Sequence, residues 1–395
     1  MANIFNRLKN SFAQLEPLPA GIYHYQSPPA DPLNYRLHLR LEPEGSGLLM
    51  INAATVLHLN QTAAEYAYHL VQNSTPQTAA EAVSSRYRIS KNIALQDFEA
   101  LQEQIHTLLT TPDLDPVTYF DYERHTPYSD KISAPYRLDC ALTYRLPAGV
   151  SPDYAPTKRV DRELTTAEWK SIIDKAWAAG IPHIVFTGGE PTLRDDLPEL
   201  IAHAEKNGQI TGLITNGLKL GDTAYLNSLL QSGLDHTMII LEPEKDQTWE
   251  SLTSFAYWTE TLNEDIFVAA HLTLTKENSN NTIALLNRLT EAGVSAISLS
   301  EADKSLSAEL QIARDYANDH EIDLVWDLPV PYSSLNPVAL ELEDEEGETS
   351  PGGAGSGWLY VEPDGDVLPG QGINKPLGNL LNQDWDMIWN AARNP

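Results

Sequence analysis

Two short stretches at the ends of predicted strands carry residue types that suit a close-fitting ligand site. The stretches are "FTGGEPTLRDDL" and "LITNGLKL", and their candidate site residues are Gly188, Gly189, Glu190, Pro191, Thr215 and Asn216. Glycine lets the backbone approach a ligand closely, and proline stops a strand and fixes the turn that follows it. The pattern therefore predicts a small-molecule site at these two strand ends.

The cysteine count limits thiolate chemistry. The chain has one cysteine, Cys140, inside the predicted strand "YRLDCALTYR". A single thiolate forms no disulfide within the chain and cannot hold an iron–sulfur cubane. We therefore interpret Cys140 as a small buried apolar residue.

Acid–base or hard-metal chemistry is an alternative use of the strand ends. The ionisable residues placed there by the sequence are Asp139, Glu190, Glu242 and His271. Such side chains near strand ends are commonly hydrogen-bonded or solvated, so we expect each of them to have a structural role.

The length of the chain limits the number of domains, and its net charge limits the kinds of partner. The chain has 395 residues, which predicts two or three domains. Its 26 Lys and Arg against 55 Asp and Glu give a net charge of −29, which repels phosphate backbones and anionic lipid. We expect no nucleic-acid partner. No apolar run has the length of a signal peptide or a membrane span, so we expect a soluble, cytoplasmic protein without membrane contact.

The first predicted domain, residues 1–110, combines a small antiparallel sheet with three helices. Alternating apolar residues in "YRLHLRLE" predict a strand that "EPEGSG" turns into the next one. Thr62 and Glu65 predict a capping box for the first helix, and Thr75 with Pro76 predicts the start of the second. The domain is predicted to be a winged-helix-like α+β unit.

Residues 135–335 alternate predicted strands with amphipathic helices. The helix after "YRLDCALTYR" starts at a capping box of Thr165 and Glu168, and the last strand of the series is "IDLVWDL". Buried strands separated by crossover helices predict a parallel sheet, here an α/β partial (β/α) barrel with ligands at the C-terminal strand ends. Residues 111–134 and the acidic and Gly-rich residues 336–357 are predicted linkers.

The strand-end motifs resemble those of the radical S-adenosylmethionine (SAM) superfamily. In that family the motif corresponding to Gly188–Pro191 holds the methionine amino group of SAM, and the motif containing Thr215 and Asn216 ends the next strand. The resemblance implies a residual SAM site at these residues.

The family also places three cysteines after the first strand to hold a [4Fe–4S] cluster. Aligning "RLPAGVSPDYAP" on Tyr154 puts Leu146, Val150 and Asp153 at those positions. Hydrocarbon side chains have no lone pair to bind iron, and a carboxylate is a hard ligand. The sequence therefore does not support the cluster, and we expect SAM, which the cluster would help to bind, to bind weakly.

Residues 358–395 resemble the start of a SPASM or twitch extension. Gly370 stands where such an extension commonly has a cluster-binding cysteine. We expect this tail to close the open end of the barrel, with Trp358, Trp385 and Trp389 packed as core aromatics.

Part of the first domain, "VLHLNQTAAEYAYHLVQNSTPQTAAEAVSSRYRISKNIALQDFEALQEQI", resembles the peptide-recognition domain of the pyrroloquinoline quinone chaperone. That resemblance implies a leader or substrate peptide that adds a strand to the sheet edge; a plain packing domain is the alternative. The sequence thus predicts a pseudoenzyme or accessory protein of peptide maturation. Two alternatives stay open: a catalytic radical SAM peptide-modifying enzyme, or a cysteine-depleted version of one, and a non-radical barrel enzyme that uses strand-end carboxylates.

Overall fold

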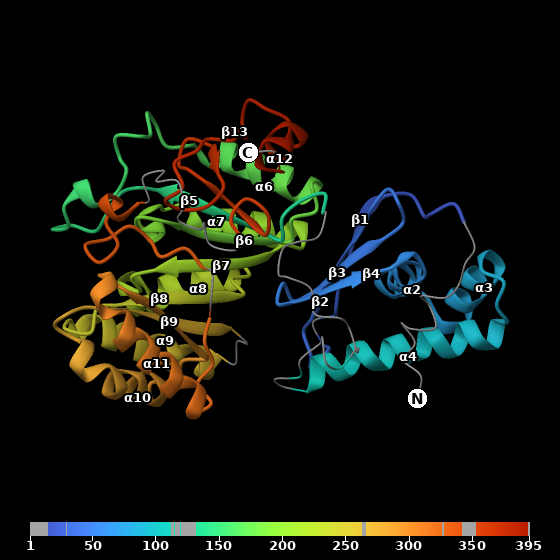
Figure 1. Cartoon of the computed structure of the whole chain (residues 1–395), viewed down its shortest axis with the longest axis horizontal. Coiled ribbons are helices and arrows are strands. Elements are labelled where there is room, and N and C mark those ends of the chain that lie inside the picture. Colours follow the sequence, from blue (N-terminus) through green and yellow to red (C-terminus); the bar gives the residue numbers. More distant parts are fainter. Residues whose placement is uncertain are drawn as a thin grey trace. The chain divides into compact units, whose positions relative to one another are not determined.

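The computed structural model describes residues 15–28, 30–111, 114, 119, 132–262, 266–325, 328–341 and 353–393. Residues 1–14 of the first predicted domain, most of the predicted linker 111–134 and residues 342–352 of the second predicted linker lie outside the described residues. The chain divides into two compact units, Met1–Ser133 and Ala134–Pro395 (Figure 1).

The first unit contains a four-stranded antiparallel sheet in the order β1-β2-β3-β4. Its strands are β1 Gly21–Gln26, β2 Arg36–Leu41, β3 Gly47–Ile51 and β4 Thr55–Leu59. Leu37, Leu39 and Leu41 belong to the core of this unit, as the alternation in the sequence predicts. The edge strands of the sheet are β1 and β4.

Three helices follow, and they complete the core of the first unit: α2 Gln61–Val71, α3 Pro76–Arg86 and α4 Lys91–Thr110. Thr75 caps α3, as predicted, but the capping box at Thr62 and Glu65 is wrong. The side chain of Asn60 caps α2 instead, and it accepts from the Ala63 amide. Glu65 lies within the helix, where its buried carboxylate pairs with Arg86 at 2.7 Å.

The second unit contains a nine-stranded sheet in the order β10-β9-β8-β7-β6-β5-β11-β12-β13. Six parallel strands form the series from β5 to β10, and they are β5 Arg137–Thr143, β6 His183–Gly188, β7 Ile210–Thr215, β8 His236–Leu241, β9 Phe267–Leu274 and β10 Ala296–Glu301. Among the strands of the described residues, β10 and β13 are the outermost two of this sheet. The partial-barrel form stays a prediction.

Helices join successive parallel strands (Figure 1). They are α6 Thr166–Ala178, α7 Leu197–Asn207, α8 Thr223–Gln231, α9 Asp246–Leu262 and α10 Thr282–Glu291, and a further helix, α11 Ser307–Asp319, follows β10. The capping box of Thr165 and Glu168 is present at the start of α6. The predicted strand "IDLVWDL" is reduced to a single bridge between Leu324 and Ile297, and residues 326–327 of it are not described.

One face of the parallel sheet, called the inner face here, is defined by a cluster of Val185, Ile214, Met238, Ile240 and Ala269. Val325, Leu328 and Val330, which follow the bridge at Leu324, pack against this cluster. The chain after α11 therefore runs back over the inner face.

The C-terminal tail joins the main sheet, which the sequence did not predict. It forms β11 Trp358–Val361, β12 Asp366–Leu368, β13 Gly378–Asn379 and α12 Trp385–Arg393. Strand β11 pairs in parallel with β5, and the tail thus extends the sheet instead of only closing one end of a barrel. Trp358 and Trp389 are buried, as expected, whereas Trp385 is half-buried.

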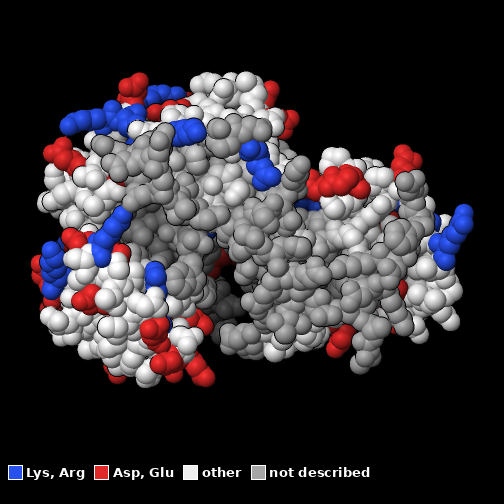
Figure 2. All heavy atoms as spheres, viewed as in Figure 1, with Lys and Arg blue, Asp and Glu red and all other residues white. Residues whose placement is uncertain are grey.

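Among the described residues, no helix has the length and apolar character needed to cross a membrane. On the face drawn in Figure 2, each unit shows both acidic and basic side chains.

Candidate functional site

Gly188 and Gly189, at the end of β6, lie against the chain that leaves β5. The Gly189 amide donates to the Thr143 carbonyl at 2.8 Å, and the Glu190 amide donates to the Arg145 carbonyl at 2.9 Å. Gly188 has a φ of +132°, and a Cβ there would lie 2.2 Å from the Thr143 carbonyl oxygen. A Cβ at Gly189 would lie 2.4 Å from the Arg145 oxygen. These two positions require glycine because another part of the same chain, and not a ligand, lies close to their backbone.

The Glu190 carboxylate joins the ends of β6 and β7. Its Oε1 accepts from the Thr192 amide at 3.0 Å, the Thr192 hydroxyl at 2.6 Å and the Thr215 hydroxyl at 2.7 Å, and its Oε2 accepts from the Asn216 amide at 2.8 Å. Burial raises the pKa of Glu190, and these hydrogen bonds oppose the rise. The structure therefore brings Glu190, Thr215 and Asn216 together in a hydrogen-bonded cluster within the protein. Pro191 begins the short turn Pro191–Leu193 beside them.

A cavity of about 60 Å³ adjoins this cluster, and we call it the strand-end cavity. Gly189, Glu190 and Asn216 line one part of it, and residues 331–335 line another. Pockets for ligands of drug size have volumes of about 300–1,000 Å³. In this conformation the cavity is too small for a molecule as large as SAM.

The loop after β5 lines the strand-end cavity with hydrocarbon side chains. Leu146 and Val150 line it, whereas Asp153 does not and is 78% exposed, 3.8 Å from Lys158. Cys140 is fully buried in β5, and burial raises the pKa of its thiol. Because thiolates are the ligands that hold a [4Fe–4S] cluster, these residues do not fit that group.

The sequence analysis missed the segment that covers the strand ends, residues 331–335. The Tyr332 amide donates to the Gly188 carbonyl at 3.0 Å. The resemblance to the SAM motif implies that residues 188–191 hold the methionine amino group of SAM. In this conformation a neighbouring part of the chain uses the Gly188 carbonyl oxygen.

A network of charged and phenolic groups holds the segment in place. Arg159 donates from Nη1 and Nη2 to Glu341 at 2.8 and 3.1 Å, and from Nε to Glu362 at 2.6 Å. The Tyr332 hydroxyl also donates to Glu341, and the Tyr144 hydroxyl donates to Glu362 at 2.9 Å. These residues lie up to 218 positions apart in the chain, so no local pattern could have revealed them.

The four ionisable candidates do not form one site. Glu190 and Glu242 line the strand-end cavity, but Glu242 pairs with Lys245 at 2.5 Å. Asp139 accepts two hydrogen bonds from Arg137 at 2.7 and 3.1 Å and lines a different pocket. His271 contacts the hydroxyls of three β9 and β10 residues, Thr273, Ser298 and Ser300. Within the described part of the chain, no group of three or more His, Cys, Asp or Glu could hold a metal ion.

The buried histidines predict a loss of stability in mild acid. Burial lowers the pKa of both His236 and His271 to about 4, below the usual 6.5. The folded state thus binds fewer protons than the unfolded state below pH 6.5. The free energy of unfolding should fall by about 1 kcal/mol per pH unit for each histidine as the pH drops from about 6.5 towards 4.

Urea unfolding of the full chain between pH 7.5 and 5 measures this effect. His271→Gln should flatten the dependence of the free energy of unfolding on pH, and His106→Gln, on the exposed side of α4, is the matched control. Equal slopes for His271→Gln and the parent chain would contradict the prediction.

Comparisons with known proteins agree with this architecture. Residues 140–300 match the sequence model of the radical SAM superfamily. A PqqA peptide cyclase of Streptomyces rochei is 26% identical over 287 residues, which cover 66% of this chain and 77% of that protein. A PqqA peptide cyclase of Granulibacter bethesdensis is 39% identical over 110 residues, 27% of this chain and 29% of that protein.

The fold also resembles a solved structure, Streptococcus suis SuiB bound to its precursor peptide SuiA. The TM-score is 0.57 at 16% identity, and the likeness covers 93% of this chain and 88% of SuiB. At that identity the likeness concerns the fold alone. The part of the chain that matches the radical SAM superfamily model, residues 140–300, contains the series of parallel strands from Cys140 in β5 to β10.

Proposed function

We propose that this protein takes part in the maturation of a ribosomally made peptide and binds a leader or substrate peptide through its N-terminal domain. In this proposal it lacks the [4Fe–4S] cluster of the superfamily and acts as an accessory protein or pseudoenzyme. The similarity to PqqA peptide cyclases supports the peptide context. We infer the absence of the cluster from two hydrocarbon side chains, those of Leu146 and Val150, which line the strand-end cavity.

An iron test separates this proposal from a catalytic radical SAM enzyme. After anaerobic incubation with iron and sulfide, the chain should show neither the brown cluster chromophore nor stoichiometric iron. A matched variant that replaces Leu146, Val150 and Asp153 with Cys should acquire both, because three thiolates would then follow β5 with the family's spacing. A cubane signal in Mössbauer or paramagnetic resonance spectra of the parent chain would overturn the proposal.

A residual SAM site belongs to the same proposal, and we expect weak binding. The strand-end cavity is small, and the Gly188 carbonyl already accepts the Tyr332 amide. A ligand as large as SAM must displace residues 331–335, which line the cavity beside this oxygen, and that displacement reduces its affinity. Isothermal titration with SAM measures this affinity, and tight binding would contradict the expectation.

Peptide binding is proposed to occur at a sheet edge of the first unit, by addition of a strand. The edge strands β1 and β4 each have one side that pairs with no other strand of the described sheet. A fluorescein-labelled leader peptide encoded beside this chain is the probe for fluorescence polarisation. Hydrogen exchange of the complex should show new amide protection in β1 or β4. Protection confined to residues 134–395 would contradict this assignment.

A non-radical barrel enzyme is the second candidate, and no specific observation favours it. Its four candidate residues lie in separate environments, and each already has partners within the protein.

A further inference from the structure

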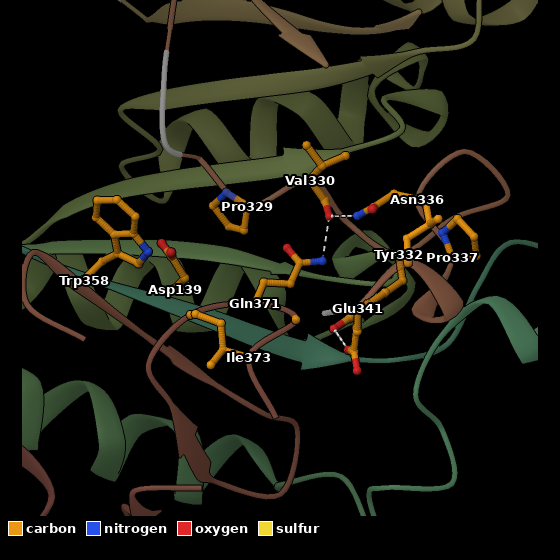
Figure 3. A pocket seen from close by; sticks show the side chains of 13 residues that line it. Asp139, Pro329, Val330, Tyr332, Asn336, Pro337, Glu341, Trp358, Gln371 and Ile373 are labelled. Carbon is orange, nitrogen blue, oxygen red and sulfur yellow. Dashed lines mark hydrogen bonds between the residues drawn. The ribbon is translucent and has the colours of Figure 1, made fainter. Parts of the chain in front are cut away.

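A second pocket, which we call the Trp358 pocket, lies on the inner face and has a volume of about 280 Å³. The chain 329–341 forms one side of it, the loop 370–373 forms another, and Asp139 and Trp358 come from β5 and β11 (Figure 3). It shares only Tyr332 with the strand-end cavity. Its volume falls just below the range for ligands of drug size and suits a group of amino-acid size.

Two amide side chains, those of Asn336 and Gln371, line this pocket. The Asn336 Nδ2 donates to the Val330 carbonyl at 2.5 Å, and the Gln371 Nε2 donates to the same carbonyl at 2.7 Å. A carbonyl can only accept, so these bonds fix which end of each amide is nitrogen. Figure 3 shows both amides directed at the Val330 carbonyl. Among the described residues, no donor is bonded to Asn336 Oδ1 or Gln371 Oε1.

Two carboxylates add further acceptor capacity. Asp139 receives one hydrogen bond on each oxygen from Arg137, and Glu341 Oε2 receives one from Arg159. A carboxylate oxygen has about two acceptor sites, so each of these three oxygens keeps one in reserve. The unused polar capacity of Asp139, Asn336 and Glu341 therefore consists of acceptors, and Gln371 keeps one N–H donor beside its acceptor oxygen. A ligand that satisfies these acceptors must bring several donors.

The charged groups around the pocket also favour a cationic ligand. Three carboxylates, those of Asp139, Glu341 and Glu362, are paired with two guanidinium groups, those of Arg137 and Arg159. A ligand with one positive charge would balance this set. A buried charge is tolerated where it is paired and hydrogen-bonded.

The remaining walls are apolar. They are formed by Pro329, Pro337, Leu340, Trp358 and Ile373. The Trp358 ring already contacts a cation, because the Arg137 guanidinium lies 4.9 Å from its centroid. An alkyl stem would pack against such walls, while its charged end met the oxygens.

We propose that the Trp358 pocket binds an alkyl group that ends in a primary ammonium or guanidinium. Two sources share this chemistry: a basic side chain of the bound peptide, which rests on the proposed function, and a free alkylamine, which does not. The experiment therefore uses both kinds of probe.

Isothermal titration of the full chain with n-pentylammonium, and with n-pentanol as the neutral match, tests the pocket directly. The ammonium should bind at least about tenfold more tightly, since hydrogen bonds to charged groups contribute about 1.5–3 kcal/mol. Equal affinity for the two probes, or no heat with the ammonium, would overturn the proposal whether or not a leader peptide binds.

The variants Glu341→Gln and Gln371→Leu should each weaken n-pentylammonium binding about tenfold or more. Glu199→Gln is the matched control, because Glu199 forms an exposed pair with Lys170 and should leave the affinity within twofold. Thermal unfolding verifies that each variant is folded. Should either variant fail to fold, the other decides, and unchanged affinity in a folded variant would contradict the proposal.

The source is identified by comparing N-acetyl-lysine methylamide with N-acetyl-norleucine methylamide. Preferential binding of the lysine compound supports a peptide side chain as the ligand. If n-pentylammonium binds and the lysine compound does not, the pocket takes a free alkylamine, and the proposal for the pocket stands without the peptide.

Discussion

Replacement of Glu190 by Ala should lower the free energy of unfolding by about 3–5 kcal/mol. The carboxylate is 3% exposed and accepts four hydrogen bonds, which tie the end of β6 to the end of β7. Its removal leaves the hydroxyls of Thr192 and Thr215 and the amides of Thr192 and Asn216 without their acceptor. Buried donors without a partner are expensive.

Urea unfolding of the full chain, followed by circular dichroism, measures this loss. Glu242→Ala is the matched control, because Glu242 also lines the strand-end cavity but forms a partly exposed pair with Lys245. The control should change the free energy of unfolding by no more than about 1 kcal/mol. A similar small change in Glu190→Ala would mean that the carboxylate does not join the two strand ends. A loss of SAM binding in Glu190→Ala would also need this stability measurement before it was assigned to a lost ligand contact.

Gly188→Ala should lower the free energy of unfolding by more than about 4 kcal/mol. The backbone at Gly188 has a φ of +132°, which is almost confined to glycine. The new Cβ would also meet the Thr143 carbonyl oxygen at 2.2 Å, and that oxygen belongs to a backbone held by the Gly189 amide. Neither partner can move without breaking the contact between β5 and β6.

Gly149→Ala isolates the effect of the close contact. Gly149 also has a positive φ, +88°, but no atom lies within 4 Å of the position of its Cβ. Only conformational strain should remain, at about 1–2 kcal/mol. Thermal and urea unfolding of both variants test the difference. Equal losses would show that the backbone angle alone requires glycine at position 188.

The alternation of strands and helices in the second unit could be predicted because each element carries its own signal. The capping box at Thr165 and Glu168 is an example, since both residues lie within one turn of the helix they cap. The predicted capping box at Thr62 and Glu65 was wrong because a competing cap lies just as close in the sequence. Asn60, two positions earlier, is an equally good cap, and it let the helix start sooner.

The candidate site was predicted in part. The strand ends meet because the carboxyl ends of parallel neighbours share one edge, so Glu190, Thr215 and Asn216 could be grouped from their motifs alone. The segment that covers them could not. Its position depends on the ion pairs of Arg159 with Glu341 and Glu362. These residues are far apart in the sequence and meet only in the folded protein.

The place of β11 has a consequence for how the protein is made. Residues 358–361 lie between β5 and β12 in the order of the sheet, although more than 200 residues separate them from β5 in sequence. During synthesis, one side of β5 stays without a neighbour until the ribosome has released the tail. A strand edge whose N–H and C=O groups are still unpaired can pair with the strands of other nascent chains. Truncation before residue 358 should therefore yield aggregates, and a chaperone that shields the β5 edge during translation would suit this order of assembly.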